Sequence, residues 1–199
     1  MGENVVPDKP SLPLSIGVFP KAGGFETTSE QLPKSKVEAE LRIAANFASA
    51  LKVRFGRELG KLTPSEWPDV VTSEGERRVG IELVEIVNPA HVKNGGYGKP
   101  QWVDEDIPHR LLLQTIREKV RKNYARPNDM DVWLLAYDLT CAVGFEHVLA
   151  KRMAHAWLCN QNHGFSEIWF MFPTPAAGSF PSVLESVWPT TEHTSTDGG

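Results

Sequence analysis

The sequence predicts an α/β fold in which helices cover both faces of a mixed β-sheet. Two continuous apolar runs of strand length, at 132–137 and 168–172, are typical of strands buried on both faces. Three segments with helical periodicity, at 36–53, 108–124 and 145–160, alternate with these runs and with an earlier strand pair. Alternation of helices and strands along the chain is characteristic of this class.

One domain accounts for most of the 199 residues, and we assign it to residues 34–189. Residues 1–33 contain five prolines and predict an extended or mobile N-terminal arm. The polar segment 190–199 predicts a disordered tail. A hydrophobic content of 41% is sufficient for a sizeable core.

Composition narrows the classes of function. The net charge of −4 gives no global reason to expect nucleic-acid binding, although it is compatible with a local basic groove. Cys141 and Cys159 are the only cysteines, a number that does not suggest a disulfide framework and fits a reducing compartment. No stretch approaches about 18 apolar residues, so we expect a cytoplasmic protein without a membrane partner and leave a homodimer open.

The first helix, 36–53, has a start signal and an apolar stripe. Ser35 is placed to cap it, and Glu38 three residues later predicts a capping box. The stripe at helical spacing consists of Val37, Leu41, Ala44, Ala48 and Leu51.

The strand pair that follows carries acidic residues in apolar β sequence. Asp69 begins the first strand, a polar turn surrounds Gly75, and Glu82 lies within the second apolar run, 79–87. A carboxylate in such a strand loses solvation and requires a cation, a donor network or a metal. Asp69 also fits an ordinary turn residue, and Glu82 also fits a structural partner of an Arg or Lys.

The elements after the strand pair complete the domain. A glycine-rich loop at 94–98 follows a strand but lacks the Gly-Lys-Ser/Thr ending of a phosphate-binding loop. Pro108 starts the helix at 108–124, which buries one apolar face and carries basic residues on the other. Pro173 ends the last strand.

The strand pair resembles the PD-(D/E)XK nuclease superfamily. The resemblance rests on Pro68-Asp69, on Gly80-Ile81-Glu82-Leu83-Val84, and on the helix–strand–strand–helix–strand order over residues 36–140. It implies a restriction-endonuclease-like mixed sheet in which Asp69 and Glu82 bind Mg²⁺ or Mn²⁺. Val84 stands where the family has a catalytic lysine.

The missing basic group has two candidate replacements in the helix at 108–124. They are Lys119, which borders the apolar face so that its side chain can turn toward the sheet, and Lys122; a solvated charged face is the alternative. Lys119 is the better placed, three residues after Ile116. Glu85 joins the site only if a bulge turns it from the opposite face.

The family often adds an acidic residue from the first helix, and Glu40 is the candidate here. It lies on the apolar face of the helix, where Glu38 is already explained by capping. Lys36, at the start of the helix, is the one basic residue spaced to pair with Glu40. The alternative is that Glu40 reaches solvent at the border of the stripe.

The expected function is metal-dependent hydrolysis of phosphodiester bonds in nucleic acid, with DNA favoured over RNA. Asp69 and Glu82 hold the metal with help from Glu40, and Lys119 supplies the catalytic cation. Phosphate contacts are expected from a basic set consisting of Lys119, Arg121, Lys122, Arg77 and Arg78. The alternative is a nuclease-like fold without catalysis that binds nucleic acid or protein.

A zinc site has weaker support. His155, Cys159 and His163 follow at intervals of four residues, but no CxxC or HExxH spacing accompanies them. Nor does the sequence identify a base for Cys159 as a nucleophile. We expect these residues to be structural.

Overall fold

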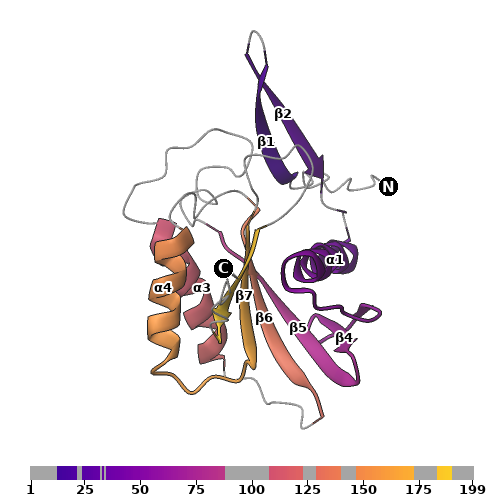
Figure 1. The fold of residues 1–199 in the computed structure, drawn as a ribbon, viewed down its shortest axis with the longest axis vertical. Helices are drawn as coiled ribbons and strands as arrows, with labels where there is room; N and C mark the ends of the chain where they lie inside the picture. Colours follow the sequence, from indigo (N-terminus) through magenta and orange to yellow (C-terminus); the bar gives the residue numbers. More distant parts are fainter. Residues whose placement is uncertain are drawn as a thin grey trace, which may run out of the picture.

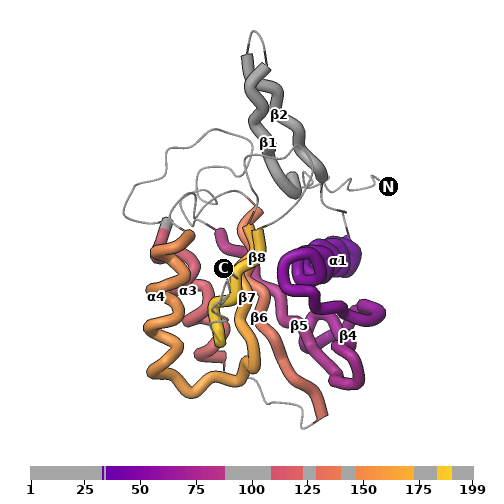
Figure 2. Tube along the Cα trace, in the orientation of Figure 1, coloured from indigo at the N-terminus to yellow at the C-terminus, as the bar shows by residue number. Residues whose placement is uncertain are grey.

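The computed structural model describes residues 13–21, 24–31, 33, 35–87, 108–122, 129–139, 147–172 and 183–189, and Figure 2 traces the chain through them. The glycine-rich loop at 94–98, the tail at 190–199 and Cys141 lie outside these ranges. Predictions for them are therefore not addressed below.

A six-stranded sheet forms the centre of the domain, and it is mixed, as the sequence predicted. Its strand order is β3-β4-β5-β6-β7-β8, in which β5, β6 and β7 are parallel and every other neighbouring pair is antiparallel. The strands span Thr63–Pro64, Val70–Glu74, Arg77–Glu85, Asp131–Tyr137, Glu167–Phe172 and Val183–Trp188 in that order.

Helices cover both faces of this sheet (Figure 1). Helix α1 (Lys36–Phe55) lies on one face, and α3 (Pro108–Arg121) and α4 (His147–Leu158) lie together on the other. The three helices coincide with the three predicted segments and differ from them only at their ends. The predicted α/β class is thereby confirmed.

Each face of the sheet has its own apolar core because strand side chains alternate between faces. Phe47 of α1 packs against Ile81 and Trp133 on one side. On the other side Leu112 and Ile116 of α3 pack against Leu134. The parallel strand β6 is buried on both faces, which explains its nearly continuous apolar sequence.

The two ends of helix α1 are capped in different ways. Ser35 occupies the N-cap position with extended backbone, but its side chain makes no capping hydrogen bond. The predicted capping box with Glu38 is therefore wrong, and Ser35 contributes through its backbone carbonyl, which accepts from Ala39 N at 3.0 Å. Gly56 ends the helix with φ 66°, a left-handed conformation that glycine adopts without steric cost.

The predicted N-terminal arm contains two strands. β1 (Pro13–Lys21) and β2 (Gly24–Gln31) pair with each other as an antiparallel two-stranded sheet. This pairing was not predicted, because the prolines at 13 and 20 argued against regular structure.

In the part of the chain that the structure describes, no helix is long and apolar enough to cross a membrane.

Candidate functional site

Glu82 is a buried carboxylate near the middle of β5. Ile81 and Leu83 pack toward α1, so alternation directs Glu82 to the face covered by α3. Glu82 is 4% exposed to solvent. Lys119 of α3 meets it there, with Nζ 2.6 Å from Glu82 Oε1, and this ammonium group compensates the buried negative charge.

Lys119 reaches the sheet because of its position on α3. Ile116, one turn earlier on the same helix face, is fully buried against the sheet. The Lys119 side chain is only 14% exposed. Of the two orientations that the sequence left open, the structure has the one directed toward the sheet, where the lysine pairs with Glu82.

Asp69 lies next to Glu82 across the strand pair. The register pairs Val70 with Ile81, and continuing it by one residue places Asp69 opposite Glu82. Asp69 Oδ2 accepts a hydrogen bond from Leu83 N at 2.8 Å. This contact satisfies a backbone donor on β5 beyond the point where its ladder with β4 ends.

Pro68 fixes the chain just before Asp69. The Pro68 ring packs on Gly80 so closely that a Cβ at Gly80 would overlap Pro68 Cγ. Pro68 is buried, and the bond between Trp67 and Pro68 is cis. Gly80 is thus required by the close approach of the preceding segment, and the contact positions Asp69 at the edge of β5.

Glu40 is partnered by Lys36 within α1. Lys36 Nζ lies 3.2 Å from Glu40 Oε1, and the Glu40 side chain is 16% exposed. The pKa of Lys36 is raised above its ordinary value, first by Glu40 and further by the charges of Asp69 and Glu82. The charges of Asp69, directly before β4, and of Glu82 on β5 therefore act on Lys36 at the start of α1.

The two strand carboxylates fit a hard divalent cation by the chemistry of their donors. Among the described residues, Asp69 Oδ1 and Glu82 Oε2 have no hydrogen-bond partner, since the contacts to Leu83 and Lys119 use the other oxygens. Carboxylate oxygens are the ligands that Mg²⁺ prefers. Within the same described ranges, no group of three or more His, Cys, Asp or Glu residues is arranged to hold a metal ion.

Glu40 is consequently not gathered with Asp69 and Glu82 into a three-carboxylate group in the structure. Of the other predicted basic residues, Arg121 ends α3 and Lys122 directly follows it, and both are exposed. Val84 is partly buried against the core beneath α3, as its apolar side chain predicts.

Arg77 and Arg78 are the first two residues of β5. Glu82 is five positions after Arg77, which corresponds to about 16 Å along a strand. Arg77 forms ion pairs with Glu74, Asp131 and Glu167. Arg78 pairs with Asp129 at 2.6 Å. The structure therefore does not bring these two arginines to the carboxylates.

Arg57 is the centre of this second charged cluster. It forms hydrogen bonds to Glu74 and Glu167, and its guanidinium group lies over the rings of Trp133 and Trp169. Burial lowers the pKa of Arg57, but the hydrogen bonds and charges of the two glutamates raise it further than burial lowers it. This charged cluster lies at the end of the sheet that contains the β4–β5 turn.

Of the three residues considered for zinc, His155 and Cys159 contact each other. Cys159 Sγ lies 3.5 Å from His155 Nε2, while His155 Nδ1 lies 3.1 Å from Val187 O. His163 contacts the ring of Trp188 edge-on. Over the residues that can be described, the three do not form a group of metal ligands.

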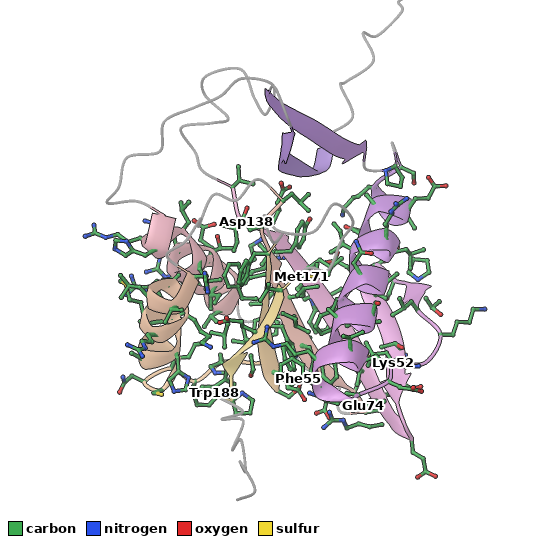
Figure 3. The ribbon with its side chains drawn as sticks, turned by 45° about the horizontal axis from the view of Figure 1, so that its top comes forward. Lys52, Phe55, Glu74, Asp138, Met171 and Trp188 are labelled. Atoms are coloured by element: carbon green, nitrogen blue, oxygen red, sulfur yellow. The ribbon has the colours of Figure 1, made fainter. Side chains whose placement is uncertain are left out.

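Two further buried acids were not identified from the sequence. Asp138 is 2% exposed and directly follows β6, at the end of the sheet marked by its label in Figure 3. Glu185 of β8 pairs with Lys151 of α4, with Nζ 2.9 Å from Oε2. A polar residue directly after the apolar run 132–137 was an available signal for Asp138.

Comparison of the chain with protein-family models, with curated proteins and with solved structures finds no match.

Proposed function

We propose that this protein is a divalent-metal-dependent nuclease with a restriction-endonuclease-like fold. The observation that carries the proposal is the buried contact between Lys119 and Glu82, on the strand that pairs with the Asp69 segment. A sequence with Val84 at the expected lysine position lacks a catalytic cation, and Lys119 provides one from the neighbouring helix.

In this proposal each residue has a distinct task. Asp69 and Glu82 hold Mg²⁺ or Mn²⁺ through the carboxylate oxygens that are not used by Leu83 N and Lys119. An ion bound there would supply a water of lowered pKa and would neutralise charge on the phosphate. Lys119 donates hydrogen bonds from its ammonium group to the anionic centre as negative charge builds up. Burial strengthens this interaction because little water competes with it.

The fixed position of the carboxylates supports this assignment. Asp69 is held by Leu83 N and by the packing of Pro68 on Gly80, and Glu82 is held by Lys119. Groups that are pre-positioned in this way lose little conformational freedom when substrate binds. We infer DNA as the favoured substrate and a single domain, residues 34–189, as the catalytic unit.

A second candidate function is a nuclease-like module that binds nucleic acid or protein without catalysis. It is favoured by the ion pair in which Lys119 already compensates the charge of Glu82. It is also favoured by the absence of a three-ligand metal group among the described residues. In that case Asp69 and Glu82 serve only the packing and hydrogen bonding of the strand pair.

The test is cleavage of single- and double-stranded DNA and RNA by the full chain, with Mg²⁺ or Mn²⁺ and with EDTA. We expect metal-dependent cleavage that Glu82→Gln abolishes and that Lys119→Met lowers by about 100-fold. Glu185→Gln is the matched control, because Glu185 is also a buried glutamate paired with a lysine, three strands and about 14 Å from β5. Cleavage that survives Glu82→Gln contradicts the nuclease proposal.

A further inference from the structure

His155 and Cys159 form a nucleophile–base pair at the end of α4. His155 is in the last turn of the helix, and Cys159 follows four residues later with its Sγ 3.5 Å from His155 Nε2, within hydrogen-bond reach of a thiol. Cys159 is exposed and is not part of a disulfide, so a reagent in solvent can reach its sulfur. The sequence did not identify a base for this cysteine, and the fold supplies one.

A β-bulge in β8 determines which nitrogen of His155 faces the thiol. The register of β7 and β8 shifts at Val187, which lies between the paired residues Ser186 and Trp188 and is left out of the pairing. The carbonyl oxygen of Val187 lies 3.1 Å from His155 Nδ1. Because a carbonyl oxygen only accepts, Nδ1 carries the proton, and in the neutral ring Nε2 presents its lone pair to Cys159.

Trp188 also holds the imidazole ring in place. The ring centroids of His155 and Trp188 are 5.6 Å apart, and the ring of His163 contacts the same indole edge-on. Trp188, labelled in Figure 3, is the last residue of β8. A nucleophile, a base within reach of it and a third group that orients the base together form the arrangement that activates a thiol.

The position at the end of a helix makes the base important. The C-terminus of α4 carries partial negative charge, which favours a cation at His155 and disfavours a free thiolate at Cys159, directly after the helix. We therefore expect the thiol proton to pass to His155 as the sulfur attacks.

We propose that Cys159 is a site of reversible modification by low-molecular-weight disulfides, with His155 as its base. His155 Nε2 takes the proton from Cys159 Sγ, and the sulfur attacks one sulfur of the disulfide. The S–S bond of the reagent breaks, and its second sulfur leaves with the electron pair and receives the proton from His155. Cys159 ends in a mixed disulfide, half of the reagent is reduced to a thiol, and excess thiol reverses the reaction. This chemistry does not depend on the proposed nuclease function.

The experiment treats the reduced full chain with oxidised glutathione at neutral pH. Peptide mass spectrometry follows the mixed disulfide at Cys159 and separates it from Cys141, the other cysteine of the chain. We expect His155→Gln to slow the reaction about tenfold, because an unassisted thiol is only a few per cent thiolate at neutral pH. The two rates should converge near pH 9, where an unassisted thiol is mostly ionised. His147→Gln, about 12 Å earlier on the same helix, is the matched control and should react like the unmodified chain.

Equal rates for His155→Gln and the unmodified chain at neutral pH overturn the role of His155. Equal slowing by His147→Gln and His155→Gln also overturns it, since the effect then comes from the helix and not from the base. A mixed disulfide at Cys141 alone, or at neither cysteine, overturns Cys159 as the site.

A second measurement needs no variant and decides the case even if His155→Gln does not fold. It compares the rate at Cys159 in the folded chain with the rate at the same residue in urea. The folded thiol should react about tenfold faster, because only the folded chain brings His155 to it. An equal or slower rate in the folded chain contradicts the proposal.

Discussion

Pro68 lies against the Cα of Gly80, and this contact places Asp69 at the edge of β5. The space for a side chain at Gly80 is filled by the Pro68 ring, with Met130 3.1 Å from the same position. We predict that Gly80→Ala pushes Pro68 away and destabilises the fold by about 1 to 3 kcal/mol, the usual cost of overpacking. Urea denaturation measures the change.

Gly75→Asn is the control for that substitution. Gly75 lies in the β4–β5 turn with φ 58°, and a Cβ there contacts nothing within 4 Å. Asparagine tolerates the left-handed region, so this variant should lose little stability. If Gly80→Ala unfolds at the same urea concentration as the unmodified chain, the packing of Pro68 on Gly80 does not contribute to stability as predicted.

Removal of Lys119 should expose the cost of a buried, unpaired charge. We predict that Lys119→Met lowers the free energy of unfolding by about 2 to 4 kcal/mol, because Glu82 remains buried without its cation. Adding Glu82→Leu removes that charge and should recover about 2 kcal/mol. Denaturant unfolding of the two single variants and the double variant gives the coupling energy.

A parallel cycle at Lys151 and Glu185 provides the comparison. Lys151 is 30% exposed, against 14% for Lys119, so water screens the pair more and the coupling should be smaller. A Lys119→Met variant as stable as the unmodified chain contradicts the view that this lysine compensates a buried carboxylate.

The sequence identified those elements that have strong periodicity or continuous apolar runs. The helices and the central strands β6 and β7 fall into this group, because burial of one stripe or of two faces leaves a clear pattern. β8 was missed because Glu185 and Ser186 interrupt its apolar run, although both are buried. β3 has only two residues, too few to leave a pattern.

The candidate site was predictable where local geometry determines it. The two-residue turn at Gly75 and Glu76 sets the register of β4 and β5, and therefore brings Asp69 to Glu82. The orientation of Lys119 depends on how α3 packs on the sheet, which its own sequence leaves open. The electrostatic influence of Asp69 and Glu82 on Lys36 likewise arises only from the tertiary fold.

Acid should weaken the cluster around Arg57. The hydrogen bond from Arg57 is the main cause that lowers the pKa of Glu74. Because this pKa is lower in the folded than in the unfolded chain, the contribution is complete above the unfolded value of about 4.3 and is lost as the pH falls through the folded value. We predict that Glu74→Gln costs about 1 to 2 kcal/mol near pH 6 and much less near pH 3.

Glu58→Gln is the comparison for Glu74→Gln. The pKa of Glu58 is also lowered, by Lys52, but the pair lies at the surface, and its removal should change the pH dependence less. Chemical denaturation at both pH values measures the difference. A Glu74→Gln variant with the pH dependence of the unmodified chain contradicts the assignment of acid sensitivity to this contact.

Arg77 should contribute to folding and not to nucleic-acid binding. Its guanidinium group pairs with Glu74, Asp131 and Glu167 and lies over the Trp133 ring, at the end of β5 remote from Glu82. We predict that Arg77→Ala lowers the free energy of unfolding by about 1 kcal/mol, since nearly half of the side chain is exposed. The salt dependence of DNA binding should be unchanged.

Arg78→Ala separates lost charge from lost packing in that experiment. Arg78 has the same charge, but among the described residues its ion-pair partner is the exposed Asp129, so its removal should alter stability by less than about 0.5 kcal/mol. Both variants remove one positive charge from the same turn, and neither should reduce the salt slope. If Arg77→Ala or Arg78→Ala reduces the slope by about 1, as expected for the loss of one phosphate contact, the β4–β5 turn belongs to the DNA-binding surface and the binding site extends along the whole of β5.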